Sequence, residues 1–328
     1  MAAMKIKDRI YGEIELAEPV LEELIASPSL QRLKWVDQAG YFEPYFPGTA
    51  HSRFEHSVGV CLLLRQYQAA VAEQIAGLIH DVSHAAFSHC IDYVLDNGTE
   101  GTQSHQDDVH ESYVKKSEIP GILVRHGYDT DYILDDANFP LKEKELPDLC
   151  ADRLDYSLRG AVIFGDLEDA DYFLDYLKAR DGRWFFADYD RARDYARLFK
   201  YLNDNYYSGL PTAVMFRTVG DYLKFALQQG YIAASDLYTT DRAVLDKIAP
   251  HHQHDPHLSA LFERMNNRVP FKNDPQNFDA AVVCKSRIVD PPYLADGRLQ
   301  RLSDSDISWQ QELEEGRIPK KYFIKFEQ

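Results

Sequence analysis

Cysteine is scarce in this sequence and is never clustered. Among its 328 residues, Cys61, Cys90, Cys150 and Cys284 lie far apart and form no C-x-x-C pair. This spacing argues against a disulfide framework and against a structural zinc site. We therefore expect an intracellular protein in a reducing compartment, the cytoplasm.

Long apolar runs are also absent. The opening residues, MAAMKIKDRIYGEIEL, contain no apolar segment of signal-peptide length, and no later window offers 18 uncharged apolar residues. We therefore expect no membrane partner. The 45% hydrophobic and 12% aromatic content is nevertheless too high for a disordered chain, so a folded protein with a buried core is expected.

Positive charge is in short supply. Lys and Arg total 36 against 53 for Asp and Glu, which gives a formal net charge of −17. Non-specific binding to nucleic acid or to anionic membranes requires a basic surface, so neither is expected. A local basic pocket inside an acidic shell is not excluded. The motifs G-x-x-x-x-G-K-[ST], G-x-G-x-x-G and G-x-S-x-G are missing, so P-loop, Rossmann and serine-hydrolase interpretations lack support.

Helical periodicity dominates what is present. We expect a mainly α fold with a small mixed α/β C-terminal part, in which residues 1–200 form the catalytic core and residues 201–328 continue it as part of one compact unit. Helices are predicted within 20–40, 53–88 (split near 67–72), 146–165, 190–205 and 212–229. Strands are predicted at 278–289 and 320–326, from their β-branched and aromatic content. Residues 96–110 are predicted to form a surface loop, and the charged run KEKELPD (142–148) a solvated helix start.

Histidines and aspartates on the predicted helices carry the chemistry. His56 ends the run HSRFEH, His80 and Asp81 lie inside GLIHDVSHAAFSH, and Asp152 lies in ADRLDYSLRG. Imidazole and carboxylate together are suitable ligands for a hydrolytic divalent metal. His84 follows His80 by four residues, so it projects near the same point. The alternative interpretation is a neutral hydrogen-bond network without metal.

The later helix carries a second polar pattern. Asp152, Asp155, Tyr156 and Arg159 fall at i, i+3, i+4 and i+7, which predicts one polar stripe along a helix. Leucines surround the stripe, so we expect it to line a cleft.

Three blocks of this sequence resemble a known family. QRLKWVDQAGYFEPYFPGTAHSRFEHSVGV, GLIHDVSHAAFSH and DRLDYSLRG are similar to the deoxynucleoside triphosphate triphosphohydrolase branch of the HD-domain phosphohydrolase superfamily. The resemblance covers roughly residues 8–165 and implies the HD-domain helical fold. It also implies that a divalent metal (Mn, Fe, Mg, Zn or Co) is bound by His56, His80, Asp81 and Asp152.

The resemblance assigns catalytic roles to further residues. His84 and His89 match the histidines that contact the α-phosphate and protonate the leaving 5′-oxygen. His110 and Glu111 match a His-Glu pair after the variable loop, although His105 competes for that match. The sequence does not reveal the carboxylate partner that His89 needs to stay protonated beside a metal.

The resemblance also implies a set of substrate contacts. In the family the residues at these positions bind phosphate, pack against the sugar or bond the 3′-hydroxyl, and here they are Arg53, Arg153, Asp155, Tyr156 and Gln38. Gly160 departs from the pattern, because the branch usually has an aspartate there. Tyr206, Tyr207 and Arg217 are candidates for the rest of the triphosphate and base pocket.

We therefore expect a metal-dependent phosphohydrolase whose partner is a nucleotide, most specifically a deoxynucleoside triphosphate cleaved to deoxynucleoside and tripolyphosphate. Two alternatives stay open. The same metal centre would also suit another phosphoester, such as a nucleoside monophosphate or a cyclic nucleotide, and a non-catalytic HD protein would sense a nucleotide without turnover. The resemblance further implies a homo-oligomer, with the aromatic-rich helices of residues 195–230 as its interface.

Overall fold

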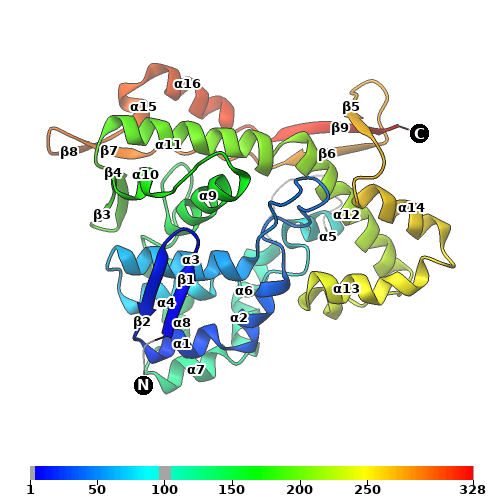
Figure 1. Ribbon diagram of the computed structural model, residues 1–328, viewed down its shortest axis with the longest axis horizontal. Coiled ribbons are helices and arrows are strands. Elements are labelled where there is room, and N and C mark those ends of the chain that lie inside the picture. Colours follow the sequence, from blue (N-terminus) through cyan, green and yellow to red (C-terminus); the bar gives the residue numbers. More distant parts are fainter. Residues whose placement is uncertain (1–3, 96–104, 328) are drawn as a thin grey trace.

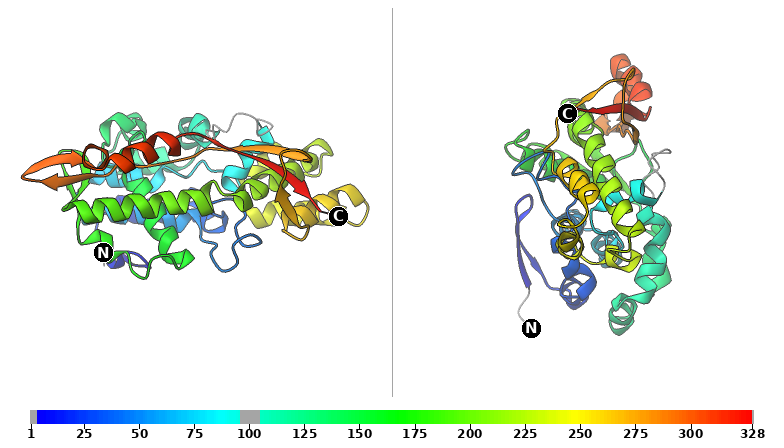
Figure 2. Two further views of the ribbon diagram at one scale, coloured as in Figure 1. Left: turned by 90° about the horizontal axis from the view of Figure 1, so that it is seen from above. Right: turned by 90° about the vertical axis from the view of Figure 1, so that its right-hand side faces the viewer.

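The fold is mainly helical, as expected, with small sheets along its margins (Figure 1). The computed structural model describes residues 4–95 and 105–327. Within these residues, no helix combines the length and the apolar content that crossing a membrane requires. The two ends of the chain lie at opposite ends of the molecule (Figures 1 and 2).

The N-terminal segment is a hairpin followed by short helices. Strands β1 (Met4–Asp8) and β2 (Gly12–Leu16) pair antiparallel, with Met4 opposite Leu16. Helices α1 (Pro19–Ile25) and α2 (Pro28–Arg32) each begin at a proline, a residue that the first turn of a helix accommodates. The 3₁₀ turn η1 (Leu33–Trp35) follows. The loop from Val36 to Ser52 then leads into α3.

Helix α3 (Arg53–Gln66) starts at a capping box. The Ser52 hydroxyl accepts from the Glu55 backbone N–H, and the Glu55 carboxylate accepts from the Ser52 N–H. This cap fixes where the helix begins and therefore how Arg53 and His56 project. Helix α4 (Val71–Ile79) packs antiparallel on α3 and ends directly before the His80–Asp81 pair.

A series of short helices surrounds this pair. They are η2 (Ser88–Ile91), α5 (Asp92–Leu95), α6 (His105–Lys116), α7 (Ile119–Arg125), α8 (Thr130–Leu134) and η3 (Asp136–Asn138). The expected loop at 96–110 is wrong for residues 105–110, which are helical. Residues 96–104 lie outside the described residues.

The central helices run across the molecule. Helix α9 (Ala151–Phe164) packs against α3, and α11 (Tyr189–Leu202) packs against α9. A π-helical turn, η4 (Asn203–Tyr207), joins α11 to the long helix α12 (Leu210–Gln228). The predicted helix at 146–165 begins later than expected, at Ala151, because residues 146–150 form turns and extended backbone.

The last elements of the chain, after residue 280, run along α11 and α12 (Figure 2). One sheet has the order β3-β4-β7-β8, from β3 (Leu177–Arg180), β4 (Arg183–Phe186), β7 (Pro292–Ala295) and β8 (Arg298–Arg301). Another has the order β5-β9-β6, from β5 (Phe271–Asn273), β9 (Lys320–Phe326) and β6 (Ala280–Cys284). Helices α10 (Asp171–Leu174), η5 (Ala234–Tyr238), α13 (Asp241–Ile248), η6 (Ala249–His251), α14 (Pro256–Met265), α15 (Leu302–Ser305) and α16 (Ile307–Gly316) complete the described chain.

The sequence divided the chain at residue 200 into a catalytic core and its continuation, both within one compact unit. Residue 200 lies inside α11, and one hydrophobic core joins Phe42, Phe87 and Tyr93 to Tyr222, Val282 and Ile324. The aromatic residues expected to form an oligomer interface are largely internal, because Tyr195, Phe199, Phe216 and Tyr222 are buried within the chain. Assembly into oligomers therefore stays a prediction.

Candidate metal centre and its pocket

Two histidines and an aspartate converge from three helical segments. His56 lies on α3, His80 directly follows α4 and Asp152 is the second residue of α9. The Nε2 atoms of the two imidazoles are 3.2 Å apart, and Asp152 Oδ1 lies 2.8 Å from His56 Nε2 and 3.4 Å from His80 Nε2. These three donor atoms lie within 4.8 Å of one another.

The hydrogen bonds on the far side of each ring define which nitrogen faces this point. His80 Nδ1 lies 2.7 Å from the Gly77 carbonyl, which only accepts, so Nδ1 carries the hydrogen. His56 Nδ1 lies 2.8 Å from the Asp155 carboxylate and donates to it in the same way. Both Nε2 lone pairs of the neutral rings therefore point toward each other and toward Asp152. A divalent metal satisfies two facing lone pairs and a carboxylate together, so the residues fit such an ion, and a proton on His56 Nε2 is the alternative occupant.

Protons and metal compete at this point. Burial opposes protonation of His56, but Asp152 and Asp155 outweigh it and raise the pKa of His56 to about 9. A metal takes the place of that proton, so metal affinity falls as the pH falls.

Asp81, the fourth predicted ligand, lies beside the cluster. Its Oδ1 is 3.4 Å from His80 Nε2 and 3.3 Å from His84 Nε2, whereas its Oδ2 forms a 2.6 Å ion pair with Arg53 Nη1. Arg53 is itself buried and also donates to Ser88 Oγ and to the Gln38 carbonyl. The structure thus brings all four predicted ligands together and places an arginine against one of them.

Asp155 does not line the pocket, contrary to its expected contact with substrate. It is fully buried and accepts hydrogen bonds from His56 Nδ1, from the Tyr11 hydroxyl at 2.8 Å, and from Arg159 Nε and Nη2. Arg159 also contacts Asp8 at 3.1 Å. The expected polar stripe is therefore two pairs: Asp152 and Tyr156 face the cavity, while Asp155 and Arg159 support His56 from behind.

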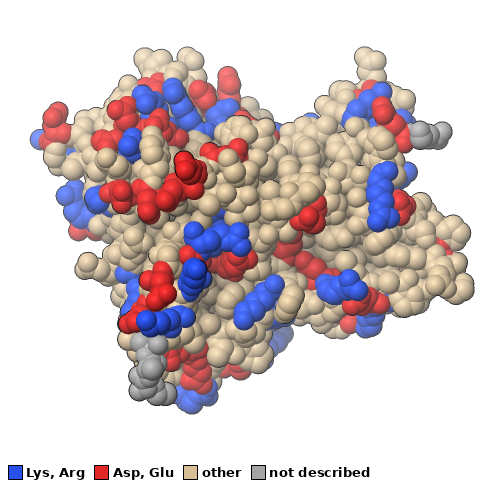
Figure 3. Space-filling view, viewed as in Figure 1, with Lys and Arg blue, Asp and Glu red and all other residues tan. Residues whose placement is uncertain are grey.

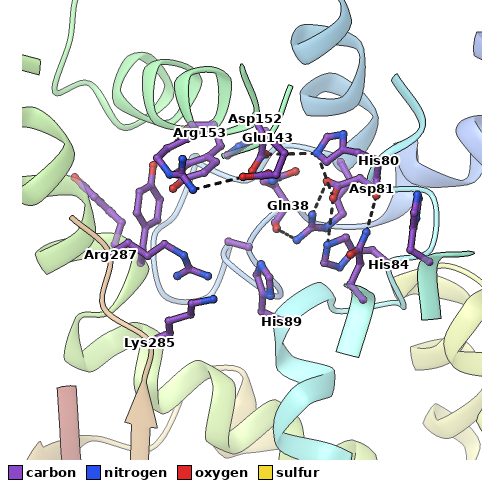
Figure 4. A pocket seen from close by; sticks show the side chains of 18 of the residues that line it. Gln38, His80, Asp81, His84, His89, Glu143, Asp152, Arg153, Lys285 and Arg287 are labelled. Atoms are coloured by element: carbon purple, nitrogen blue, oxygen red, sulfur yellow. Dashed lines mark hydrogen bonds and ion pairs between the residues drawn. The ribbon is translucent and has the colours of Figure 1, made fainter. Parts of the chain in front are cut away.

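The metal cluster forms one wall of a cavity of about 610 Å³ (Figure 4). Its lining comes from residues 38–53, 80–89 and 106–164 and also from 206–216 and 285–287. The C-terminal part of the chain therefore completes a site that the sequence assigned to residues 1–200.

His84 and His89 lie on the cavity wall next to Asp81. Burial and the neighbouring Arg53 lower the pKa of His84 to about 3. Burial also lowers the pKa of His89, but Asp92 opposes this with a carboxylate oxygen 3.6 Å from His89 Nδ1. Asp92 is the partner that the sequence did not reveal, although its position three residues after His89 at a helix start was a usable signal.

His110 and Glu111 lie on α6 at the same cavity. His110 Nδ1 is 3.0 Å from Ser83 Oγ, and burial lowers the pKa of His110 to about 4. Glu111 is 71% exposed at its side chain and pairs with Lys115 at 2.6 Å. Glu111 therefore meets solvent more than it meets the cavity.

Three of the expected substrate contacts carry buried polar atoms without a protein partner. They are Gln38 Oε1, Arg153 Nε and the Tyr156 hydroxyl, and all three residues line the cavity. Buried polar atoms are normally hydrogen-bonded, so such atoms at a cavity wall are ready to bind a ligand.

An aromatic wall lies near Gly160. The rings of Phe164 and Tyr206 stack with centroids 4.1 Å apart, and Phe42 packs 5.9 Å from Phe164. A Cβ at Gly160 would lie 2.8 Å from the Tyr207 hydroxyl, so Tyr207 fills the space that a side chain at residue 160 would need. Of the three residues proposed to complete the pocket, Tyr206 and Tyr207 line it, whereas Arg217 pairs with Asp221 on α12 away from it.

Sequence reasoning missed several charged residues of the cavity. Lys142 and Glu143 belong to KEKELPD, which is an irregular, mostly half-buried segment with Lys142 buried, and not the solvated helix start that was expected. Lys142 pairs with Asp136, and its backbone N–H bonds to Glu73. Lys285 and Arg287 come from the segment that follows β6.

A partly buried imidazole–carboxylate centre, beside a cavity lined by both cations and carboxylates, suits metal-dependent hydrolysis of a phosphoester. Comparison with known proteins agrees, since the HD domain family model matches residues 53–159. The chain is 35% identical over 298 residues to the uncharacterised protein YdhJ of Bacillus subtilis. The aligned residues cover 90% of this chain and 90% of YdhJ. The chain belongs to the HD-domain phosphohydrolase superfamily.

Other relatives match over shorter spans. The metal-dependent phosphohydrolase cns2 of Cordyceps militaris is 43% identical over 53% of this chain and 50% of its own length. The human deoxynucleoside triphosphate triphosphohydrolase SAMHD1 is 42% identical, over 26% of this chain and 16% of its own.

Solved structures share the whole fold. A phosphohydrolase from Bacteroides thetaiotaomicron superposes with a TM-score of 0.72, covering 99% of this chain and 100% of its own, at 18% identity. A hypothetical protein from Aquifex aeolicus superposes with a TM-score of 0.74, covering 99% of this chain and 96% of its own, at 19% identity. At such identities the likeness defines the fold alone.

Proposed function

We propose that this protein is a metal-dependent hydrolase of nucleotides that cleaves a deoxynucleoside triphosphate to deoxynucleoside and tripolyphosphate. The observation that carries the proposal is a single cavity that joins the His56–His80–Asp152 cluster, the His89–Asp92 pair and several cations. Phosphoester hydrolysis has three requirements, and side chains that line or adjoin this cavity can meet each of them.

The first requirement is to neutralise charge on the phosphoryl oxygens and to supply a nucleophile. A bound divalent cation polarises the phosphoryl group and lowers the pKa of water. Arg53 holds Asp81 in place by their 2.6 Å ion pair and presents a second positive charge at the cavity. Asp155 fixes the orientation of His56 through its 2.8 Å hydrogen bond.

The second requirement is a proton for the departing 5′-oxygen. Water attacks the α-phosphorus, the bond from phosphorus to the 5′-oxygen breaks, and that oxygen takes a proton. We assign this proton to His89. Burial lowers the pKa of His89, but Asp92 opposes this and favours the imidazolium form, whereas the pKa values of His84 and His110 fall to about 3 and about 4.

The third requirement is to hold the nucleoside. Gln38 Oε1 and the Tyr156 hydroxyl are buried at the cavity and unbonded, so they suit sugar hydroxyls. The stacked Phe164–Tyr206 pair offers an apolar surface of the kind on which a base packs.

The deciding experiment is a substrate screen with product chromatography. Purified protein would receive manganese, iron(II), magnesium, zinc or cobalt, and the four deoxynucleoside triphosphates would be compared with ribonucleotides, monophosphates and cyclic nucleotides. Deoxynucleoside with tripolyphosphate is the expected product. Phosphate release from monophosphates without any triphosphate cleavage would contradict the proposed substrate. Binding without turnover under every metal would favour a nucleotide sensor.

A variant separates this activity from a contaminant. Asp152→Asn removes a charged ligand while keeping the side-chain shape, so turnover should fall at least ~100-fold with the fold intact by circular dichroism. The matched control is Asp148→Asn, four residues earlier, whose carboxylate pairs with Arg301.

A further inference from the structure

Two cations enter the cavity from the C-terminal part of the chain. Along residues 284–288, buried and half-buried positions alternate, with Cys284, Ser286 and Ile288 buried and Lys285 and Arg287 half-buried. Alternation of this kind places Lys285 and Arg287 on one face of an extended segment. Figure 4 shows both side chains reaching into the cavity, across from His80 and Asp81.

The backbone that carries these cations is fixed in place. The buried Asn203 side chain accepts from the Arg287 backbone N–H at 2.9 Å and donates to Ser286 Oγ at 3.1 Å. Asn203 begins the π-helical turn η4, which also carries Tyr206 and Tyr207 to the cavity wall. The buried Asn203 amide therefore links the cationic segment to the turn that carries the aromatic wall. This link fixes the backbone from which Lys285 and Arg287 project.

The charge of Arg287 acts on the catalytic region. It contributes to lowering the pKa of His89, and it also opposes the raised pKa of Tyr156. Arg287 therefore faces the same space as the proposed acid and the proposed sugar contact. In Figure 4 the labelled carboxylates Asp81, Asp152 and Glu143 lie at the metal wall, and His89 lies between that wall and the two cations.

We propose that Lys285 and Arg287 form a second anion subsite, which binds the part of a phosphate chain that extends beyond the phosphate at the metal centre. The inference rests on the proposed function and names the residues that would hold the phosphate chain of its substrate. A triphosphate chain supplies further anionic groups to this wall, whereas a single phosphate at the metal centre supplies none. Ammonium and guanidinium groups bind phosphate oxygens through charge-assisted hydrogen bonds.

The test measures binding without turnover. Inorganic tripolyphosphate and orthophosphate would be titrated calorimetrically into the metal-free full chain and into the double variant Lys285→Met/Arg287→Met. The double variant should bind tripolyphosphate at least ~10-fold more weakly, since two charge-assisted contacts are lost. The control is Lys178→Met/Arg180→Met, an exposed pair with the same i, i+2 spacing on β3, which should bind as the unchanged protein does.

Single variants keep the subsite testable if the double variant does not fold. Lys285→Arg keeps the charge and should keep tripolyphosphate binding, whereas Lys285→Gln should weaken it. Equal binding of tripolyphosphate by the unchanged protein and by the charge-removing variants would overturn the subsite, as would no tripolyphosphate binding by the unchanged protein.

The outcomes also separate the subsite from the proposed function. Cleavage of triphosphates with an unchanged KM in the double variant would leave the function standing and remove the subsite. Tripolyphosphate binding that depends on the pair, in a protein that cleaves no triphosphate, would keep the subsite and remove the proposed reaction.

Discussion

Asp155 illustrates how a residue chosen for one role performs another. Its carboxylate accepts four hydrogen bonds, one from Tyr11, one from His56 and two from Arg159. Burial raises the pKa of Asp155, but the Arg159 charge and these bonds outweigh it and lower the pKa to about 2. A permanently charged acceptor behind His56 keeps the Nδ1 hydrogen in place and leaves Nε2 free for a metal.

This arrangement predicts a selective loss of metal affinity. Asp155→Asn should weaken Mn²⁺ binding about 10- to 100-fold in calorimetric titration, because a neutral amide orients His56 less firmly. Tyr11→Phe is the matched control, since it removes a hydrogen bond to the same carboxylate without touching the imidazole. It should cost about 1 kcal/mol of stability and leave metal affinity within ~3-fold. Equal losses of affinity in the two variants would contradict the orienting role.

Asp92 predicts a shift in the pH dependence of turnover. Its carboxylate favours the protonated form of His89, so Asp92→Asn lowers the pKa of His89 further. The protonated fraction is then lost at lower pH, and the alkaline fall of kcat/KM should move down by about one pH unit. Asp221→Asn, which alters a carboxylate outside the cavity, should leave the profile unchanged. A uniform loss of activity with the same profile would indicate a structural role only.

The residues of this site differ in how far the sequence reveals them. His56, His80, Asp81 and Asp152 lie up to 96 residues apart, and they were predicted together from the motifs on which the family resemblance rests; the structure brings them together. Asp155 was misassigned because helical periodicity places it near Asp152 but does not say whether that face meets a cavity or another helix. Lys285 and Arg287 were missed because they reach the site only through tertiary contacts with η4.

Among the elements, the close packing of α3 on α9 holds the metal ligands together. Gly59 of α3 faces Asp155 and Arg159, and a Cβ at residue 59 would lie 2.1 Å from both Asp155 Oδ1 and Arg159 Nη2. A side chain at this position would therefore separate His56 from Asp152.

Gly59→Ala should consequently lower both stability and metal binding. We expect a loss of about 1–3 kcal/mol in the free energy of unfolding, because a methyl group must displace buried charged groups. Gly121→Ala on the exposed side of α7 is the control, since its nearest neighbour would be Arg125 Nη1 at 3.5 Å. It should stabilise by about 0.5–1 kcal/mol through helix propensity. Denaturant unfolding measures both, and a stable, metal-binding Gly59→Ala would contradict the packing argument.

The helices and the last strand were predictable, since the strand expected at 320–326 is β9, but the bounds of the other predicted strand were not. Helices α3, α4, α11 and α12 follow from local periodicity, and only their ends differ from expectation. The strand expected over 278–289 ends at Cys284, because from Lys285 onward the chain bonds to Asn203 and not to β9. Pairings between residues so distant in sequence leave no local signal.

At the scale of the whole molecule, the acidic balance does not reach the cavity. On the face shown in Figure 3, acidic and basic side chains are mixed, with no extended basic area. The cavity lining instead carries balanced formal charge, because Arg53, Lys142, Arg153, Lys285 and Arg287 lie beside the carboxylates of Asp81, Glu111, Asp136, Glu143 and Asp152. Long-range attraction of an anionic nucleotide is therefore weak, and recognition depends on short-range contacts inside the cavity.

A buried carboxyl joins the two halves of the chain behind this cavity. Asp241, which opens α13, accepts from the backbone N–H groups of Asp37 at 2.8 Å and of Phe87 at 2.7 Å. Burial and the nearby Asp37 raise the pKa of Asp241 to about 8, despite those hydrogen bonds. In the unfolded chain an aspartate has a pKa near ~3.9.

Stability should therefore depend on pH through this carboxyl. Below pH ~4 it is protonated in both states, and between pH ~4 and pH ~8 only the folded state holds the proton, so its contribution falls as the pH rises and is lost above the folded pKa. Asp241→Asn keeps a neutral group of the same shape, so its stability relative to the unchanged protein should improve steadily from pH 5 to pH 8. Denaturant unfolding across that range measures this difference, with Asp246→Asn on the same helix as the control. A difference that stays constant with pH would show that Asp241 is already charged in the folded protein, and that its two backbone hydrogen bonds outweigh burial and the neighbouring Asp37.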